Sequence, residues 1–392
     1  MRDRNIIRRA PLLLAIPPVI LMRLLSPLVL VRIGQTNAGR IGHFAMDLEL
    51  SLLKKRSYAK SSFFPIIFDF YFIDGTPSNS YLLQLWQKEI TFYPRWLLKP
   101  IHRLNIKLPG SSKYDVFNEV THTDLTLLDK FEPTLKMSQE DEDSANTALK
   151  EFGISQQDKI VCLCVRDSEY LRVTFPETDW NEHNHRDTDI NTYVEAAELL
   201  AKMGYKVFRM GNIVRDKLES DSSSVIDYAN SSIRSELLDI YLFSRADFVI
   251  TTSTGMDFLG ALFRIPIGIV NSVSLKSIYQ GELLKYYQPK EIMDTNSGQR
   301  LGLEELIERG YQRAYNQSDF ASMNIGFIDN SSDDLCNFFS DMESLVRNMV
   351  TEQYSPKAIA ILEKYKITNK NWAKLSPAWL TSHSYFLTPR RY

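Results

Sequence analysis

The chain has 392 residues, of which 44% are hydrophobic and 24% are charged, a composition typical of globular and not of disordered or fibrous proteins. This length is too great for one ordinary core and predicts two domains. The net charge of -2 provides no basic field, so we expect no nucleic-acid partner. Cys162, Cys164 and Cys336 form no disulfide framework or zinc motif, which predicts reduced thiols, a cytoplasmic protein and no metal site.

The first 27 residues combine basic and apolar character. Arg2, Arg4, Arg8 and Arg9 precede an apolar run over residues 10–22 that contains three prolines. A membrane-spanning helix needs about 20 apolar residues, more than this run provides. We expect residues 1–27 to associate with the inner membrane surface and to contribute little to the fold, with packing on the first domain or a true membrane span as the alternatives.

The first predicted domain covers residues 28–155. A strand is expected at 28–34, a helix at 44–56 and a second strand at 65–73. The polar stretch that follows residue 131 resembles a domain boundary with one helix inside it.

The second predicted domain covers residues 156–350, and a helical tail follows at 351–392. Strands expected at 159–165, 205–211, 224–230, 247–251 and 265–271 alternate with helices expected at 191–204, 231–246 and 256–263. This alternation predicts an α/β fold with a doubly wound parallel sheet.

Polar residues follow the predicted strands of the second domain. Ligands of open parallel sheets bind beyond the carboxyl ends of the strands, so these residues form a candidate anion site. Arginine binds phosphate with two parallel hydrogen bonds, and free backbone N–H groups at a helix start add further donors. The residues at the successive strand ends are Arg166 and Asp167, Arg209 and Gly211, Asp227 and Tyr228, and Ser253, Thr254, Gly255 and Asp257.

Structural roles are the alternative for the same residues. Arg166 can pair with Asp167 or Asp187, and the hydroxyl-rich segment before residue 256 can simply cap a helix. Neither a P-loop nor a GxGxxG motif occurs. The repetition of polar residues on successive strand ends favours the anion site.

Two further segments carry candidate functional side chains. The loop at 183–190 contains two histidines, Arg186 and Asp187, and can close over a ligand, while Asp189 can serve as a helix cap. In the first domain, Gly42 and His43 precede a helix that contains Glu49. We expect His43 to act as a general base, with a helix-start cap as the alternative, and Glu49 to line the site or to be solvated.

The motifs together resemble a known family. The segments "KIVCLCVRDSEYL", "HRDTDINTYVEAAELLAKMGYKVFRMG", "VIDYANSSIRSELLDIYLFSRADFVITTSTGMD" and "RIGH" are similar to those of a family of bacterial glycosyltransferases with a two-Rossmann GT-B fold. More distantly, "CVRD" and "FVITTSTG" resemble motifs of GDP-fucose-using fucosyltransferases, in which a His-x-Arg motif and a Ser/Thr loop hold the diphosphate. This sequence has Cys164 where that motif has histidine.

The resemblance implies a GT-B-like enzyme with two Rossmann-like domains that face a central crevice. It would transfer a sugar, without metal or cofactor, from a nucleotide-diphosphate sugar to a glycan or lipid-linked acceptor of surface polysaccharide or lipopolysaccharide. The catalytic residues would be His43, Arg166 and Arg186, and Gly42 and Glu49 would lie on the acceptor side. The donor-binding residues would be Asp167, Asp187, Arg209, Gly211, Asp227, Tyr228, Ser253, Thr254, Gly255 and Asp257. A sugar-nucleotide epimerase and a non-catalytic nucleotide- or glycan-binding module are the alternatives.

Overall fold

The computed structural model describes residues 12–58, 66–118, 120–351 and 354–388. The chain forms two compact units. The N-terminal unit comprises Met1–His122 and Lys130–Lys136, and the C-terminal unit comprises Thr123–Asp129 and Met137–Tyr392. This division lies earlier in the chain than the predicted boundary between residues 155 and 156.

The C-terminal unit contains a parallel sheet of six strands in the order β5-β4-β3-β6-β7-β8. The predicted α/β class with a doubly wound parallel sheet is confirmed. The order is that of dinucleotide-binding folds, in which the chain starts at the centre, winds to one edge and then returns to wind to the other. The strands are β3 (Lys159–Cys164), β4 (Tyr205–Arg209), β5 (Val225–Ile226), β6 (Phe248–Thr251), β7 (Ile267–Ser272) and β8 (Leu284–Pro289).

Ten helices and a two-stranded antiparallel sheet complete the described part of this unit. The small sheet pairs β9 (Glu291–Asp294) with β10 (Ile325–Ile328). The helices are α6 (Gln139–Glu151), α7 (Glu169–Thr174), α8 (Val194–Lys202), α9 (Glu236–Arg245), α10 (Asp257–Leu262), α11 (Leu303–Glu308), α12 (Gln317–Ser322), α13 (Ser332–Val346), α14 (Pro356–Lys364) and α15 (Pro377–Ser382).

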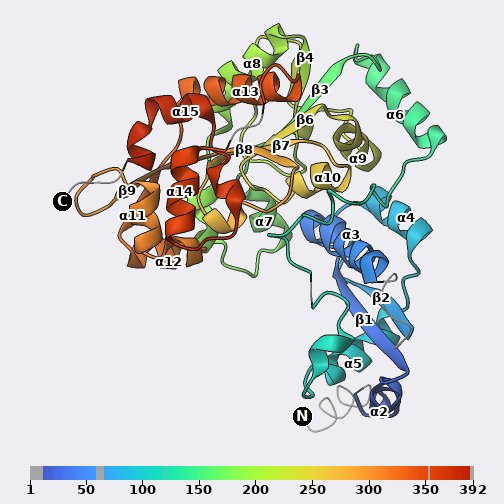
Figure 1. The fold of residues 1–392 in the computed structure, drawn as a ribbon. Helices are drawn as coiled ribbons and strands as arrows, with labels where there is room; N and C mark the ends of the chain where they lie inside the picture. Colours follow the sequence, from blue (N-terminus) through green and yellow to red (C-terminus); the bar gives the residue numbers. More distant parts are fainter. Residues whose placement is uncertain (1–11, 59–65, 119, 352–353, 389–392) are drawn as a thin grey trace. The chain divides into compact units, whose positions relative to one another are not determined.

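Helices cover both faces of the six-stranded sheet (Figure 1). On one face, α8 and α13 share a buried core with alternate residues of the strands, among them Val161 and Leu163 of β3. On the other face, α9 contacts β3, and α10 contacts β6 and β7. Because both faces are covered, the central strands are largely apolar, and Cys162 and Cys164, which alternate with Val161 and Leu163 along β3, are buried unpaired thiols.

Two glycines allow helices to approach this sheet closely. A Cβ atom on Gly268 of β7 would lie 2.8 Å from the sulfur of Met342 in α13, and one on Gly260 of α10 would lie 2.8 Å from Cγ2 of Val249 in β6. Any larger residue at either position would push its helix away from the strand.

Side-chain caps define the starts of several helices. The hydroxyl of Ser235 accepts a hydrogen bond from Leu238 N at the start of α9, and Ser331 forms a capping box with Asp334 at the start of α13. The predicted cap at Asp189 is confirmed, because its Oδ1 accepts a hydrogen bond from Asn191 N (2.9 Å).

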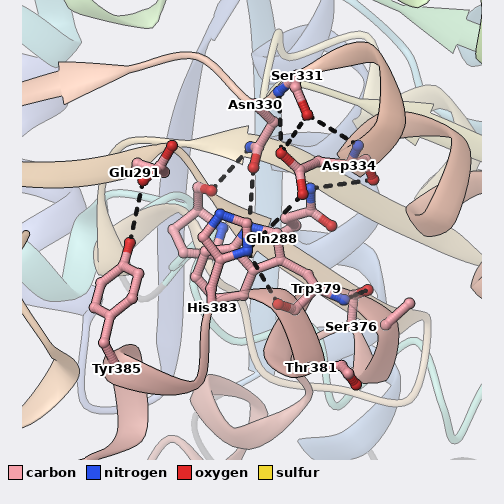
Figure 2. Close-up of polar contacts among 12 residues, drawn as sticks. Gln288, Glu291, Asn330, Ser331, Asp334, Ser376, Trp379, Thr381, His383 and Tyr385 are labelled. Carbon is pink, nitrogen blue, oxygen red and sulfur yellow. Dashed lines mark hydrogen bonds and ion pairs between the residues drawn. The ribbon is translucent and has the colours of Figure 1, made fainter.

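Buried polar contacts hold the last helices against the rest of the C-terminal unit (Figure 2). Trp379 Nε1 donates to Asn330 Oδ1 (2.9 Å), and Asn330 Nδ2 in turn donates to the carbonyl of Pro289 (2.9 Å) at the end of β8. The ring of His383 stacks on Trp379 with centroids 4.5 Å apart. The segment predicted as a helical tail is therefore helical and packs into the body of this unit.

The N-terminal unit contains two parallel strands, β1 (Val29–Asn37) and β2 (Ile66–Asp74), paired over their full lengths. Arg32 and Asp69 are register partners, and their side chains form an ion pair with an Nε to Oδ1 distance of 2.7 Å. The described residues of this unit include the α-helices α2 (Ile16–Leu25), α3 (Ile41–Tyr58), α4 (Ser80–Glu89) and α5 (Arg95–Asn105). The strands and the helix predicted for residues 28–73 are confirmed.

Helix α2 is half-buried. Val19 and Met22 are buried, and Met22 belongs to a core cluster with Ile33, Phe72, Leu98 and Tyr114. Arg23 Nε donates to Asn105 Oδ1 (2.8 Å) at the end of α5. The expectation that this segment contributes little to the fold is therefore wrong for α2, because one face of the helix supplies part of the core.

The other face of α2 is apolar and exposed. The exposed fractions of Leu21 and Leu24 are 56% and 72%. The four arginines of the predicted basic cluster lie outside the described residues. Among the described residues, no helix is both long and apolar enough to span a membrane.

Candidate functional site

The candidate site of the C-terminal unit lies where the winding of the sheet reverses. From β3 the chain winds to β4 and β5, and from β6 it winds to β7 and β8, so the carboxyl ends of the adjacent strands β3 and β6 border the crevice that this reversal creates. The backbone N–H of Arg166, just beyond β3, donates to the hydroxyl of Thr252, just beyond β6 (2.9 Å). The predicted strand-end residues are thus brought together at the position where ligands of such sheets bind.

Arg166 is buried at this position and paired with a carboxylate. Its exposed fraction is 7%, and its Nε lies 3.2 Å from Oδ1 of Asp187. The hydroxyl of Ser168 donates to the other oxygen of Asp187. The ion pair that the sequence offered as the alternative role of Arg166 is therefore present, and its partner is Asp187.

The loop that contains Asp187 returns to the ends of both central strands. Arg186 donates from Nη2 to the backbone carbonyl of Ser253, beyond β6, and Thr188 N donates to the carbonyl of Arg166 (3.3 Å). Lys290 donates from Nζ to the carbonyl of Asp187 (2.8 Å). The loop's own Arg186, together with Arg166 and Lys290 that contact the loop, therefore places three cationic side chains at the carboxyl edge of the sheet.

The loop between β6 and α10 is held in an unusual backbone conformation. Ser253 and Gly255 have φ angles of 59° and 92°. The N–H groups that the sequence analysis expects to be free are in use, because Gly255 N donates to Oδ1 of Asp257 (2.8 Å) and Met256 N donates to Oγ1 of Thr254 (3.1 Å). An anion would have to replace these short-range acceptors or bind through the neighbouring side chains.

Asp257 at the start of α10 is almost completely buried. Burial raises the pKa of its carboxyl above the ordinary value, although the hydrogen bond from Gly255 N opposes that shift. This carboxyl therefore holds the loop from inside the protein.

A second buried arginine lies at the end of β4. The exposed fraction of Arg209 is 1%, and its Nη1 donates to Oδ1 of Asp227 (3.1 Å). Its Nη2 lies 3.7 Å from Oδ2 of Asp167, at the end of β3. These contacts connect the predicted residues of three neighbouring strands.

Two other predicted donor-binding residues have packing contacts. The hydroxyl of Tyr228 is buried and donates to Oδ1 of Asp239 in α9 (3.0 Å). A Cβ atom on Gly211 would lie 2.7 Å from Cγ1 of Val214, so this position has no room for a side chain. Their role in donor binding stays a prediction.

A cavity of about 510 Å³ adjoins this site. Its lining includes His185, which belongs to the same loop as Arg186 and Asp187, and Lys290, which donates to the carbonyl of Asp187. The cavity is lined by Asn181, Asn184, His185, Lys290, Gln317, Ile325, Gly326 and Phe327. Six of these, Asn181, Lys290, Gln317 and the three β10 residues, carry no motif in the sequence, and all but Asn181 are distant in the chain from the loop at 183–190.

His185 is the titratable group of this cavity that is most perturbed by its surroundings. Burial, and to a smaller extent the positive charge of Arg186, lower the pKa of its imidazole to about 4. The ring stacks on Phe327 with centroids 6.0 Å apart. Within the part of the chain that the structure describes, neither ring nitrogen has a hydrogen-bond partner. His185 is thus a buried imidazole in the wall of this cavity.

The predicted base of the N-terminal unit lies in a cluster of two imidazoles and one carboxylate. His43, in the first turn of α3, has its Nδ1 3.3 Å from Oδ2 of Asp47, one helical turn later. Nε2 of His122 contacts the other oxygen of Asp47. Burial of Asp47 raises the pKa of its carboxyl, but the hydrogen bonds from His122 and His43 outweigh that effect and hold the pKa below its ordinary value.

The cluster combines a residue that the sequence predicts with two that it does not. Asp47 could have been found from its spacing of four residues on a helix, but no sequence signal connects His122 with either residue. Gly42 and Glu49 are buried, and Glu49 Oε1 accepts a hydrogen bond from Thr134 N (3.3 Å). The solvated alternative for Glu49 is therefore wrong, while contact with an acceptor stays a prediction.

Two solved structures are similar to this chain. The family 9 glycosyl transferase from Veillonella parvula DSM 2008 aligns with 12% identity and a TM-score of 0.37 over 65% of this chain and 85% of its own. The E. coli ADP-heptose LPS heptosyltransferase II aligns with 12% identity and a TM-score of 0.34 over 75% of this chain and 98% of its own. Scores this low carry no argument about this chain. No protein-family model and no curated protein matches it.

Proposed function

We propose that the protein is a glycosyltransferase that moves a sugar from a nucleotide-diphosphate sugar to a glycan or lipid-linked acceptor in bacterial surface polysaccharide or lipopolysaccharide biosynthesis. The observation that carries the proposal is the position of Arg166. It lies at the reversal of a doubly wound parallel sheet, 7% exposed, next to the loop Thr252–Gly255. This is where such sheets bind nucleotides, and the motifs around it are those that resemble glycosyltransferases.

In this proposal the C-terminal unit binds the donor. Arg166 and Arg186 contact the diphosphate, and their permanent charge stabilises the negative charge that develops on the leaving nucleotide. The adjoining cavity holds another part of the donor through His185 and the amides of Asn181, Asn184 and Gln317. Buried arginines are suited to this role because their charge does not change with pH.

The N-terminal unit presents the acceptor in the same proposal, and His43 removes the proton from the attacking hydroxyl. A proton on Nδ1, donated to Asp47, leaves Nε2 as the basic nitrogen of His43. Asp47 is then a positioning residue that fixes the orientation and the protonated nitrogen of the ring. Gly42 and Glu49 belong to the acceptor side through their place on the first and third turns of α3.

Catalysis in this proposal uses no metal and no cofactor, because arginines supply the charge that a cation would supply. Activity should not fall in excess EDTA. A loss of activity that magnesium or manganese restores would contradict this and would point to Asp187, Asp189 and Asp257 as ligands.

We also propose that the enzyme works in the cytoplasm, peripherally bound to the inner membrane through the exposed face of α2. Leu21 and Leu24 on this face are more than half exposed, and the basic residues 2–9 precede it in the chain. Leu24→Ser should weaken binding to vesicles that contain anionic lipid. Met349→Ser removes an apolar side chain that is 66% exposed in the C-terminal unit and should not weaken it. Equal binding of both variants would contradict the proposal.

The donor experiment distinguishes the proposed transferase from its alternatives. The purified chain is incubated with a panel of nucleotide-diphosphate sugars, with and without glycan acceptors. Transfer to an acceptor or slow hydrolysis of one donor supports the transferase. Interconversion of two nucleotide sugars would show an epimerase, and saturable binding without turnover would show a binding module.

A further inference from the structure

The cluster of His43, Asp47 and His122 has the composition of a transition-metal site. One ring nitrogen of His43, one ring nitrogen of His122 and a carboxylate oxygen of Asp47 all lie within 4.8 Å of one another. The nitrogens that contact the Asp47 carboxylate are Nδ1 of His43 and Nε2 of His122. Two imidazoles and one carboxylate are a common protein donor set for zinc, with the fourth position left to water or another ligand. Magnesium and calcium prefer oxygen donors and are not favoured by this set.

The cluster is also accessible to an ion, and a helix holds two of its residues at a fixed spacing. His43 and Asp47 lie one turn apart on the long helix α3, so the helix fixes their spacing. The side chains of His43, His122 and Asp47 are 35%, 28% and 13% exposed, so the cluster is open to solvent on the imidazole side while the carboxylate is largely enclosed. The two rings meet edge to face with centroids 4.7 Å apart, and their nitrogens contact different oxygens of the same carboxylate.

We propose that His43, Asp47 and His122 bind a zinc-class divalent cation, and that the bound ion reversibly inhibits the enzyme. Coordination uses the lone pair of Nδ1 of His43, so the ring proton moves to Nε2. The nitrogen that would accept the acceptor's proton is then an N–H donor and no longer a base. Binding of the ion does not depend on the proposed glycosyl transfer, whereas the inhibition rests on it.

Binding is tested first, without any substrate. The full-length chain is stripped with EDTA, freed of chelator and titrated with zinc in competition with a chromogenic chelator, and with cobalt(II) by visible absorption. We expect one equivalent of zinc and the intense visible bands of low-coordinate cobalt. His122→Ala and Asp47→Asn should each weaken zinc binding by about 100-fold or more, since even loss of an outer-shell partner costs about 10- to 100-fold.

A matched control excludes adventitious binding to histidines. His183 is also partly exposed but lies in the C-terminal unit, so His183→Ala should keep the stoichiometry and affinity of the wild type. Zinc should raise the melting temperature of the wild type and of His183→Ala but not that of His122→Ala, which also checks that each variant is folded. Failure of the wild type to bind one equivalent, or equal affinity in the cluster variants, would overturn the metal site.

Inhibition is then measured with the donor and acceptor found in the panel. One equivalent of zinc should abolish most of the transfer by the wild type, and EDTA should restore it. The residual activity of His122→Ala should be insensitive to the same zinc concentration. If zinc binds at the cluster and transfer continues unchanged, the metal site stands and the role of His43 as the base is wrong.

Discussion

At the carboxyl edge of the six-stranded sheet, Arg166 and Arg209 are buried against aspartates, whereas in the N-terminal unit two imidazoles share the carboxylate of Asp47. A guanidinium keeps its charge at every physiological pH, but an imidazole gains or loses its proton in that range and can exchange it for a metal. The first cluster is therefore suited to binding an anion and the second to moving a proton. Substitutions in the two clusters should have different kinetic consequences.

The largest effect is expected for the imidazole cluster. His43→Ala should lower kcat by about 100- to 10,000-fold, the usual contribution of a general base. It should leave the affinity for the nucleotide diphosphate unchanged, because in the proposed function the other unit binds the donor. Turnover and calorimetric nucleotide binding measure the two quantities. A kcat close to that of the wild type would show that His43 is not the general base.

The arginine cluster should respond in binding as well as in rate. Removing one partner of a buried charged contact costs about 2 to 5 kcal/mol, so Arg166→Ala should lower kcat/KM by about 30- to about 5000-fold. Arg166→Lys should restore part of this, because lysine keeps the charge and loses the paired donors. Turnover, nucleotide affinity by calorimetry and thermal melting are measured for both variants.

Arg172 provides the matched control for this arginine. It forms an exposed ion pair with Glu169 on α7, and its side chain is 70% exposed, so Arg172→Ala should preserve activity and stability. If Arg166→Ala binds the nucleotide as the wild type does but melts earlier, the contact with Asp187 is structural and the proposed donor site is misplaced.

The two faces of α2 in the N-terminal unit should respond differently to the loss of an apolar side chain. Met22→Ala removes a buried side chain from the small core of the N-terminal unit and should lower the free energy of unfolding by about 2 to 4 kcal/mol. Leu24→Ala, at a position 72% exposed, should change it by less than about 0.5 kcal/mol. Chemical denaturation compares the two, and equal losses would show that α2 is packed on both faces.

The smallest expected effect is a pH dependence of the C-terminal unit. Burial lowers the pKa of His185 from 6.5 to about 4, so the neutral imidazole stabilises the fold above pH 6.5 and this stabilisation is lost as the pH falls towards 4. The loss between pH 7 and pH 5 is about 2 kcal/mol. His185→Phe should retain the stacking on Phe327 and reduce this loss, as urea denaturation at both pH values would show.

The wild type must be compared with His185→Phe, because the contribution of another buried group to the stability changes with pH in the opposite direction. Burial raises the pKa of Asp239 to about 6, so its contribution improves as the pH falls. An equal loss of stability in wild type and His185→Phe on acidification would contradict the assignment to His185.

Local patterns in the sequence were sufficient for most of the fold. The apolar runs that became β3, β6 and β7, the helical periodicity of α8 and the cap at Asp189 each depend on neighbouring residues alone, so they could be recognised without the structure. The strand-end positions of Arg166 and Ser253 followed from the same runs. The late strand β8 and the pair β9 and β10 were not predicted, because their polar and aromatic residues interrupt any simple alternation.

Only the tertiary structure decided which of these residues meet. The strand order placed the ends of β3 and β6 side by side, and the loop at 186–188 returned to both, so Arg166 acquired Asp187 as its partner. Likewise, His122 reached Asp47 from 75 residues away, and Lys290 joined the cavity beside His185. Secondary structure depends on contacts between near neighbours in the chain, whereas a site of this kind depends on long-range contacts that no local pattern encodes.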